Sequence, residues 1–280
     1  MNLLNSLLKN SNFVSLKEIE TLGLKDLAIV SFSSLNHLSE AIRSCDSFQQ
    51  NPSLNNTPFL IYLSNDVSET VKTLYSELCP IAKIIPLNLS DYPDYVQDLS
   101  QYRFKPIYQA LSLQKYKVIL NVDTSIRFDP NFNFSNLISD VIKQNPTDVT
   151  LLASNSHNMF SVTHPKMFEC FPHINKKAVN NKIHTIQKRP LILWIGSENG
   201  LKIMKKFITC ALHPECMGPT GSTTNCDYSL MTKFPNRFSG CHRFDQSAIN
   251  LILLEESKYR PSLFQIESNF FKIRRDSKLK

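Results

Sequence analysis

The chain has 280 residues, 42% of them hydrophobic, and its 31 basic and 24 acidic residues give a formal net charge of +7. This length can bury a sizeable core, and no linker divides it, so we expect one domain over residues 24–275, an N-terminal extension over 1–23 and a basic tail over 276–280. The positive charge is dispersed and lacks the aromatic or zinc-finger spacings of nucleic-acid-binding proteins, which argues against nucleic acid as a partner. A basic groove for a diphosphate would fit this charge equally well.

In chain order, hydrophobic periodicity predicts strands that alternate with helices. The predicted strands are Leu27–Phe32, Phe59–Leu63, Ile81–Leu87, Val149–Leu152 and Pro190–Ile195. The predicted helices are Leu35–Phe48, Ser68–Leu78, Leu137–Lys143, Glu198–Leu212 and Asp245–Glu256. Alternation of this kind predicts an α/β fold, with a mostly parallel central sheet and helices on both faces.

The segment from Tyr102 to Asp129 is the most informative part of the chain. A helix that starts near Pro106 leads into an apolar strand, and Asp123 follows directly at the carboxyl end of that strand. In open α/β sheets the ligand crevice lies outside the carboxyl ends of the strands. Asp123 is therefore a candidate to meet a substrate or a metal.

Glycine usage excludes several classes of α/β protein. The chain has six glycines, and none lies between residues 24 and 195. A dinucleotide-binding turn and a P-loop both need glycines so that the backbone can approach phosphates, and neither can be built here. A Gly-x-Ser-x-Gly nucleophile elbow is also missing, which argues against an α/β-hydrolase. A nucleotide would have to be held by side chains or by a metal.

Four of the seven cysteines, Cys210, Cys216, Cys226 and Cys241, are concentrated in one segment. Some of them should be paired if the protein matures in an oxidising compartment. The alternative is that all seven are ordinary buried thiols. No Cys-x-x-Cys pair occurs, so a structural zinc site is not expected. The N-terminus lacks the pattern of a signal peptide, and no stretch approaches the ~20 apolar residues of a membrane span.

Four sequence blocks resemble one known family. They are Lys105-Pro106, Asp123-Thr-Ser-Ile-Arg-Phe, Thr163-His-Pro-Lys-Met and Cys241-His-Arg-Phe-Asp-Gln-Ser-Ala-Ile-Asn. The strand that ends at Asp123 is similar to the strand that carries the Asp-x-Asp motif of GT-A glycosyltransferases. The four blocks together resemble an animal family, described as a domain of unknown function, whose members are inferred to be hexosyltransferases.

This resemblance implies a GT-A-like fold and transfer of a hexose from a nucleotide-sugar donor to a glycan, protein or lipid acceptor. It also implies a divalent cation, Mn²⁺ or Mg²⁺, and a place in the secretory pathway or Golgi lumen. A cytoplasmic location is the alternative, because no leader or anchor is visible in the sequence. The acceptor is not specified.

The same resemblance assigns roles to individual residues. Asp123 would hold the metal and act in catalysis, and Asp245 would serve the acceptor as the second catalytic residue. Donor-binding residues would be Lys105, Ser125, Arg127, His242 and Gln246, with His242 as a further candidate metal ligand. Ser125 departs from the pattern, because many GT-A enzymes have a second acid at that position.

Each of these residues also has a structural interpretation. Asp123 could cap the loop at the end of the strand, Asp245 could cap its helix, and Lys105 could be a surface lysine. A lone histidine such as His242 is more often structural than a ligand. Three functions therefore stay open: a hexosyltransferase, a catalytically inactive homologue that binds a glycan or a protein, and, with less support, a nucleotidyltransferase.

Overall fold

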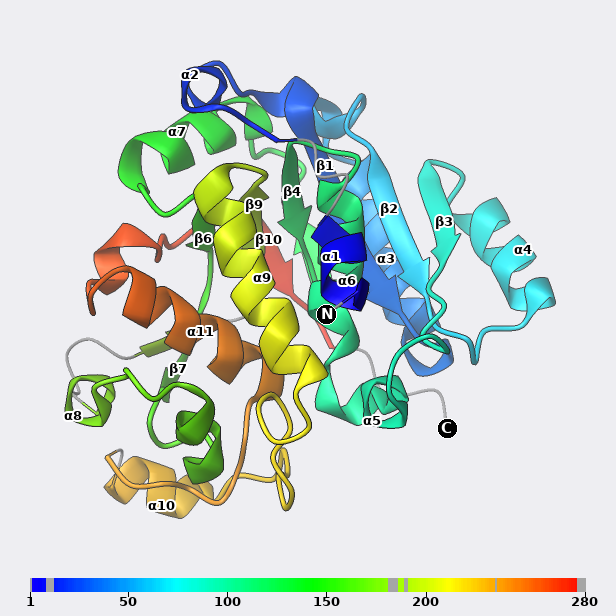
Figure 1. The fold of residues 1–280 in the computed structure, drawn as a ribbon. Helices are drawn as coiled ribbons and strands as arrows, with labels where there is room; N and C mark the ends of the chain where they lie inside the picture. Colours follow the sequence, from blue (N-terminus) through cyan, green and yellow to red (C-terminus); the bar gives the residue numbers. More distant parts are fainter. Residues whose placement is uncertain (1, 9–12, 181–185, 189–190, 235, 276–280) are drawn as a thin grey trace.

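The computed structural model describes residues 2–8, 13–180, 186–188, 191–234 and 236–275. Its central sheet has six strands in the order β3-β2-β1-β4-β9-β6 (Figure 1). The strands are β1 (Leu27–Ser33), β2 (Phe59–Leu63), β3 (Ala82–Pro86), β4 (Val118–Asn121), β6 (Val149–Leu151) and β9 (Ile192–Ile195). Only β9 runs antiparallel to its neighbours in this sheet, β4 and β6. The predicted mostly parallel sheet is confirmed.

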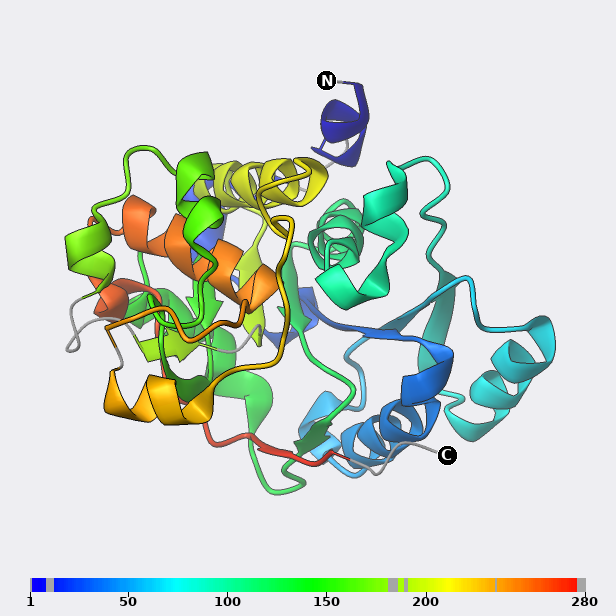
Figure 2. The same ribbon diagram turned by 90° about the horizontal axis from the view of Figure 1, so that it is seen from below.

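Helices cover both faces of the sheet (Figures 1 and 2). On one face lie α1 (Asn2–Leu8), α6 (Phe104–Leu113), α9 (Glu198–Leu212) and α11 (Phe244–Glu256). On the other lie α3 (Leu38–Gln49), α4 (Glu69–Leu78) and α7 (Leu137–Gln144). Successive strand residues point to opposite faces, so Ala28 and Val30 enter one core while Leu27 and Ile29 enter the other. The two cores explain why the strands read as continuous apolar runs.

Shorter elements complete the chain. The short helices are α2 (Leu16–Ile19), α5 (Asp94–Gln97), α8 (Lys176–Val179) and α10 (Tyr228–Lys233). Two small antiparallel pairs join β5 (Ile126–Phe128) to β10 (Phe271–Ile273) and β7 (Ser154–Asn158) to β8 (Ile186–Lys188). Within the described ranges, the structure contains no helix with the length and hydrophobicity that a membrane span requires.

Most predicted elements occur at or near the predicted positions. The helix expected over Leu35–Phe48 begins with a 3-10 turn, Leu35–His37, before α3. The helix expected from Pro106 begins two residues earlier, at Phe104. Of the strand predicted over Pro190–Ile195, residue 190 lies outside the described residues. The boundaries of the N-terminal extension at residue 23 and of the domain at residue 275 stay predictions, and residues 276–280 also lie outside the described part.

The predicted pairing within the cysteine-rich segment is confirmed. Cys210 bonds to Cys216, and Cys226 bonds to Cys241. A third disulfide, Cys45–Cys79, was not predicted from the sequence; it joins α3 to the end of α4. Cys170 is a free thiol.

The strand order locates the ligand crevice. From β1 the chain adds β2 and then β3 on one side, and then returns to place β4 on the other side of β1. The order therefore reverses between β1 and β4, and such a switch point opens a crevice at the carboxyl ends of the two strands. Asp123 lies just beyond the carboxyl end of β4, at this crevice.

Candidate functional site

Three sequence-predicted residues meet at the carboxyl end of β4. The Lys105 ammonium, near the start of α6, lies 3.6 Å from Oδ1 of Asp123 and 3.1 Å from Oδ2 of Asp245. Asp245 is the second residue of α11, so the contact joins two helices to the loop after β4. We call Lys105, Asp123 and Asp245 the carboxylate–lysine cluster.

The cluster is buried except at one carboxylate. The side chains of Lys105 and Asp245 are 8% and 4% exposed, whereas that of Asp123 is 42% exposed. Lys105 is therefore not the surface lysine of the structural interpretation. Asp123 is the most exposed group of the cluster.

Charge coupling shifts the pKa values in opposite directions. Burial works against the charged form of Lys105, but Asp123 and Asp245 raise its pKa, so the ammonium stays protonated. Burial likewise opposes ionisation of Asp123, but Lys105 and Arg275 hold its pKa below the ordinary value. For Asp245, burial prevails and raises the pKa, with Lys105 working against that shift.

Asp245 depends on Lys105 for its counter-charge. Its Oδ2 atom is buried and lies 3.1 Å from the Lys105 ammonium. Little water can reach this oxygen, so the ion pair is the contact that compensates its charge.

Two residues next to the cluster have strained backbone conformations, one just before α6 and one at the start of α11. Tyr102, three residues before Lys105, has φ 57°, and Phe244, immediately before Asp245, has φ 37°. Both are bulky residues in a region that such residues rarely adopt, and strain of this kind is concentrated at functional sites. Their rings are 5.9 Å apart, and the Lys105 ammonium lies 4.9 Å from the centre of the Tyr102 ring. Tyr102 thus forms part of the wall around Lys105.

The end of the described chain supplies a cation that the site prediction did not include. Nη2 of Arg275 lies 3.6 Å from Oδ2 of Asp123. Strand β10 pairs with β5, and the Arg274 N–H donates to the Ser125 carbonyl at 2.8 Å, which fixes this segment beside the loop after β4. The signal in the sequence was the basic cluster near the C-terminus, but sequence spacing does not reveal which of its members lies at the sheet edge.

His242 is a structural residue in this fold. Its Nδ1 accepts from the backbone N–H of His164 at 3.1 Å, so Nε2 carries the proton and donates to the Met217 carbonyl at 3.0 Å. The ring is fully buried, and burial lowers its pKa to about 3. Both nitrogens are engaged by backbone groups, which leaves no lone pair for a metal.

The other predicted donor-binding residues lie around the cluster. Ser125 is buried and follows Asp123 in the loop. The Arg127 guanidinium donates to the Thr124 carbonyl at 2.7 Å and lines a separate cavity with Lys272. Gln246 is half-buried in the first turn of α11. Their donor-binding roles stay predictions.

The residues present do not fit a divalent cation. Each oxygen of Asp123 already has a positive group 3.6 Å away, namely Lys105 and Arg275. Asp245 is buried against Lys105, the Ser125 hydroxyl is a weak ligand, and His242 is engaged. In the described part of the chain, no group of three or more His, Cys, Asp or Glu side chains could hold a metal. A metal here would place a third positive centre at one carboxylate.

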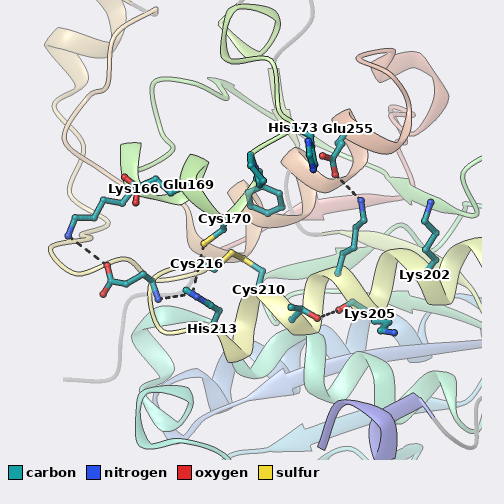
Figure 3. Close-up of a pocket in the computed structure, with 15 residues that line it drawn as sticks. Lys166, Glu169, Cys170, His173, Lys202, Lys205, Cys210, His213, Cys216 and Glu255 are labelled. Atoms are coloured by element: carbon teal, nitrogen blue, oxygen red, sulfur yellow. Dashed lines mark hydrogen bonds and ion pairs between the residues drawn. A yellow bond between two sulfur atoms is a disulfide. The ribbon is translucent and has the colours of Figure 1, made fainter. Parts of the chain in front are cut away.

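A cavity of about 700 Å³ lies elsewhere (Figure 3). It is formed by the segment around Cys170, the second half of α9 and the Cys210–Cys216 disulfide. Its cations are partly neutralised, because Lys206 pairs with Glu255 at 2.8 Å and Lys166 with Glu215 at 3.8 Å. It shares no lining residue with the carboxylate–lysine cluster.

Comparison with known proteins gives one family match and several structural similarities. Residues 1–110 match the family described as "Protein of unknown function (DUF1647)". Among curated proteins, none matches the sequence.

The structure is similar to mouse xyloside xylosyltransferase 1 in its apo form, with a TM-score of 0.45, 10% identity and coverage of 86% of this chain and 84% of that one. It is also similar to galactosyltransferase LgtC in complex with donor and acceptor sugar analogues, with a TM-score of 0.42, 10% identity and coverage of 86% and 73%. A third similar structure is the Mn/GDP form of core-mannan synthase A from Aspergillus fumigatus, with a TM-score of 0.45, 12% identity and coverage of 82% and 69%. Similarity at this level assigns no activity to the chain.

Proposed function

We propose that the carboxylate–lysine cluster binds a nucleotide sugar and transfers its hexose to an acceptor hydroxyl. The observation that carries the proposal is the buried Lys105 ammonium, held between two carboxylates at the switch point of the sheet. The absence of glycines between residues 24 and 195 leaves a diphosphate to be held by side chains or by a metal, and Lys105 is the side chain placed for that task. The four sequence blocks that resemble hexosyltransferases include all three residues of the cluster.

The reaction breaks the bond between the sugar C1 atom and the β-phosphate oxygen of the donor. The electron pair of that bond stays on the phosphate, and the acceptor oxygen forms the new bond to C1 and loses its proton. Lys105 offsets the charge that develops on the leaving diphosphate, and this effect is strong because the ammonium is buried and fixed before the reaction begins. Asp123, the exposed carboxylate, accepts hydrogen bonds from donor hydroxyls.

Asp245 has two roles in this proposal. Its ion pair fixes the position of Lys105, and its raised pKa makes it a better proton acceptor than an ordinary carboxylate. The acceptor hydroxyl would give its proton to Asp245, as the sequence prediction holds. The Mn²⁺ or Mg²⁺ of that prediction is not part of the proposal, because the donor set does not fit a metal.

We place this chemistry in an oxidising compartment, as the resemblance predicts. Three disulfides support that location, since such bonds persist in the secretory pathway and are rare in the cytosol.

The test is a thermal-shift screen of nucleoside diphosphates and nucleotide sugars, followed by an assay for release of nucleoside diphosphate in the presence of candidate acceptor sugars. A ligand that binds only the folded state raises the melting temperature by mass action, so a donor should stand out from related nucleotides. We expect one nucleotide family to shift the transition and its sugar conjugates to turn over. A nucleoside triphosphate alone as the stabilising ligand would indicate a nucleotidyltransferase instead.

The inactive homologue is the second candidate, and two observations favour it. Ser125 stands where many GT-A enzymes have an acid, and Asp123 is neutralised by cations on both oxygens. If a glycan raises the melting temperature in the thermal-shift screen and no nucleotide does, the result would support this candidate over the transferase.

A further inference from the structure

The described part of the C-terminal segment contacts the same carboxylate that the proposed donor must approach. Arg275 lies 3.6 Å from Oδ2 of Asp123, whereas Lys105 lies 3.6 Å from Oδ1, and the Arg275 side chain is 60% exposed. Two anchors hold the segment in place. Phe270 is fully buried and its carbonyl accepts the Asp129 N–H at 2.8 Å, and β10 continues the pairing to Ser125.

The two cations of this segment lie in different places. Phe271 and Ile273 of β10 line a small cavity together with Asp123 and Ser125. Lys272, between them in the strand, lines another cavity, with Arg43 and Arg127. Successive residues of a strand point to opposite faces, so Lys272 belongs to the face opposite to that cavity with Asp123. Arg275 lies two residues beyond the end of β10 and contacts Asp123 directly.

We propose that this chain holds the diphosphate of its donor without a divalent cation, between the ammonium of Lys105 and the guanidinium of Arg275. The inference rests on the function proposed above. It adds Arg275 to the site and specifies that two side-chain cations, rather than a metal, bind the diphosphate. The two cations share one anion at the crevice, Asp123, which lies 3.6 Å from each of them. Binding exchanges that carboxylate for the diphosphate, which frees Asp123 to accept donor hydroxyls. Guanidinium groups suit this task because their fork of donors matches phosphate oxygens.

The experiment measures the affinity of UDP and GDP by calorimetry in EDTA and in Mn²⁺. The variants are Arg275→Gln and, as a matched control, Lys272→Gln, which removes the same charge three residues away, at a position that lines a cavity without Asp123. We expect binding in EDTA that Mn²⁺ leaves unchanged within about threefold, and a loss of about tenfold or more in Arg275→Gln but not in Lys272→Gln. Both changed side chains lie on an exposed edge of the chain, and the melting temperature checks that the fold is kept.

Asp123→Asn separates the two charge mechanisms. Without a metal, this change removes a competing anion, so nucleoside diphosphate should bind in EDTA at least as tightly as to the wild type. A metal site requires the opposite result, namely weaker binding. Binding that needs Mn²⁺ and ignores Arg275→Gln would overturn this inference and leave the proposed function standing. No binding of UDP or GDP under any condition would overturn this inference, and no response to any nucleotide in the thermal-shift screen would overturn the proposed function as well.

Discussion

Lys105 and Asp245 form a buried ion pair, with 3.1 Å between the ammonium and Oδ2, that links the first turn of α6 to the first turn of α11. The two residues are far apart in the chain, and each helix delivers its residue through a strained preceding backbone, at Tyr102 and Phe244. A buried pair of this kind is weak evidence for stability, since desolvation offsets most of the attraction. We therefore attribute the arrangement to function.

Removal of Lys105 alone should destabilise the protein. Lys105→Met leaves Asp245 buried without a counter-charge, and the loss of one partner of a buried pair typically costs about 3–5 kcal/mol. The double variant Lys105→Met/Asp245→Asn restores the charge balance and should recover most of that loss. Chemical denaturation of the single variants and the double variant measures the coupling. Additive effects of the two changes would show that the pair is not coupled in solution.

Asp245→Asn should separate binding from turnover. The change keeps the size of the side chain and removes its ability to accept a proton, so transfer should fall by ~100-fold or more. Donor affinity should fall much less than turnover, because Lys105 and Arg275 both keep their charges, although Lys105 loses one of its two carboxylate partners. Initial rates at saturating donor and a parallel binding titration distinguish the two effects. Undiminished turnover would remove Asp245 from the catalytic role.

The fold class was predictable because the strands are buried on both faces and therefore read as continuous apolar runs. The Phe59–Leu63 strand and the Glu198–Leu212 helix were predicted with the boundaries that the structure has. The short edge pairs were not, because β5 and β10 have only three residues each and depend on contacts between distant parts of the chain. Likewise, the Cys45–Cys79 bond requires knowledge of how α3 and α4 pack.

The candidate site was predictable in part. Asp123, Lys105 and Asp245 could be selected because each lies at a strand or helix end, and the structure brings them together. The contribution of Arg275 could not be selected, since it depends on the pairing of β10 with β5. The structural role of His242, whose ring bonds the backbone of His164 and of Met217, could not be predicted either, because a sequence does not show that a ring is buried.

The close approach of α9 to the sheet should make Gly200 intolerant of a side chain. A Cβ atom at this position would clash with the backbone carbonyl oxygen of Ile195, which cannot move without disturbing β9. Gly200→Ala should therefore cost about 1–3 kcal/mol of folding free energy. Gly23→Ala is the matched control, because nothing lies within 4 Å of its added Cβ atom, and it should change stability by less than about 0.5 kcal/mol. Equal melting temperatures for the two variants would contradict the packing described here.

Burial of neutral His242 should make stability depend on pH. The pKa of this ring is about 3 in the folded protein against an ordinary value of 6.5, so between these values the unfolded chain binds the extra proton. The free energy of unfolding should therefore fall as the pH drops below 6.5, by up to about 1.4 kcal/mol per pH unit from this group. In His242→Gln that contribution disappears, so the curve of stability against pH should be flatter between pH 6 and pH 4, as denaturant titrations at ~0.5-unit steps would reveal. Parallel curves for the two proteins would mean that the ring is protonated without loss of the fold.

The most direct test of the proposed function compares nucleoside diphosphate binding to the wild type and to Lys105→Met/Asp245→Asn. The double variant replaces both members of the buried pair by neutral residues and should therefore stay folded. A loss of affinity can then be attributed to the missing Lys105 ammonium. We predict that the dissociation constant of the nucleotide selected by the thermal-shift screen rises at least about tenfold in the double variant, with an unchanged circular dichroism spectrum. An equal dissociation constant for the two proteins would show that the nucleotide does not bind at the carboxylate–lysine cluster.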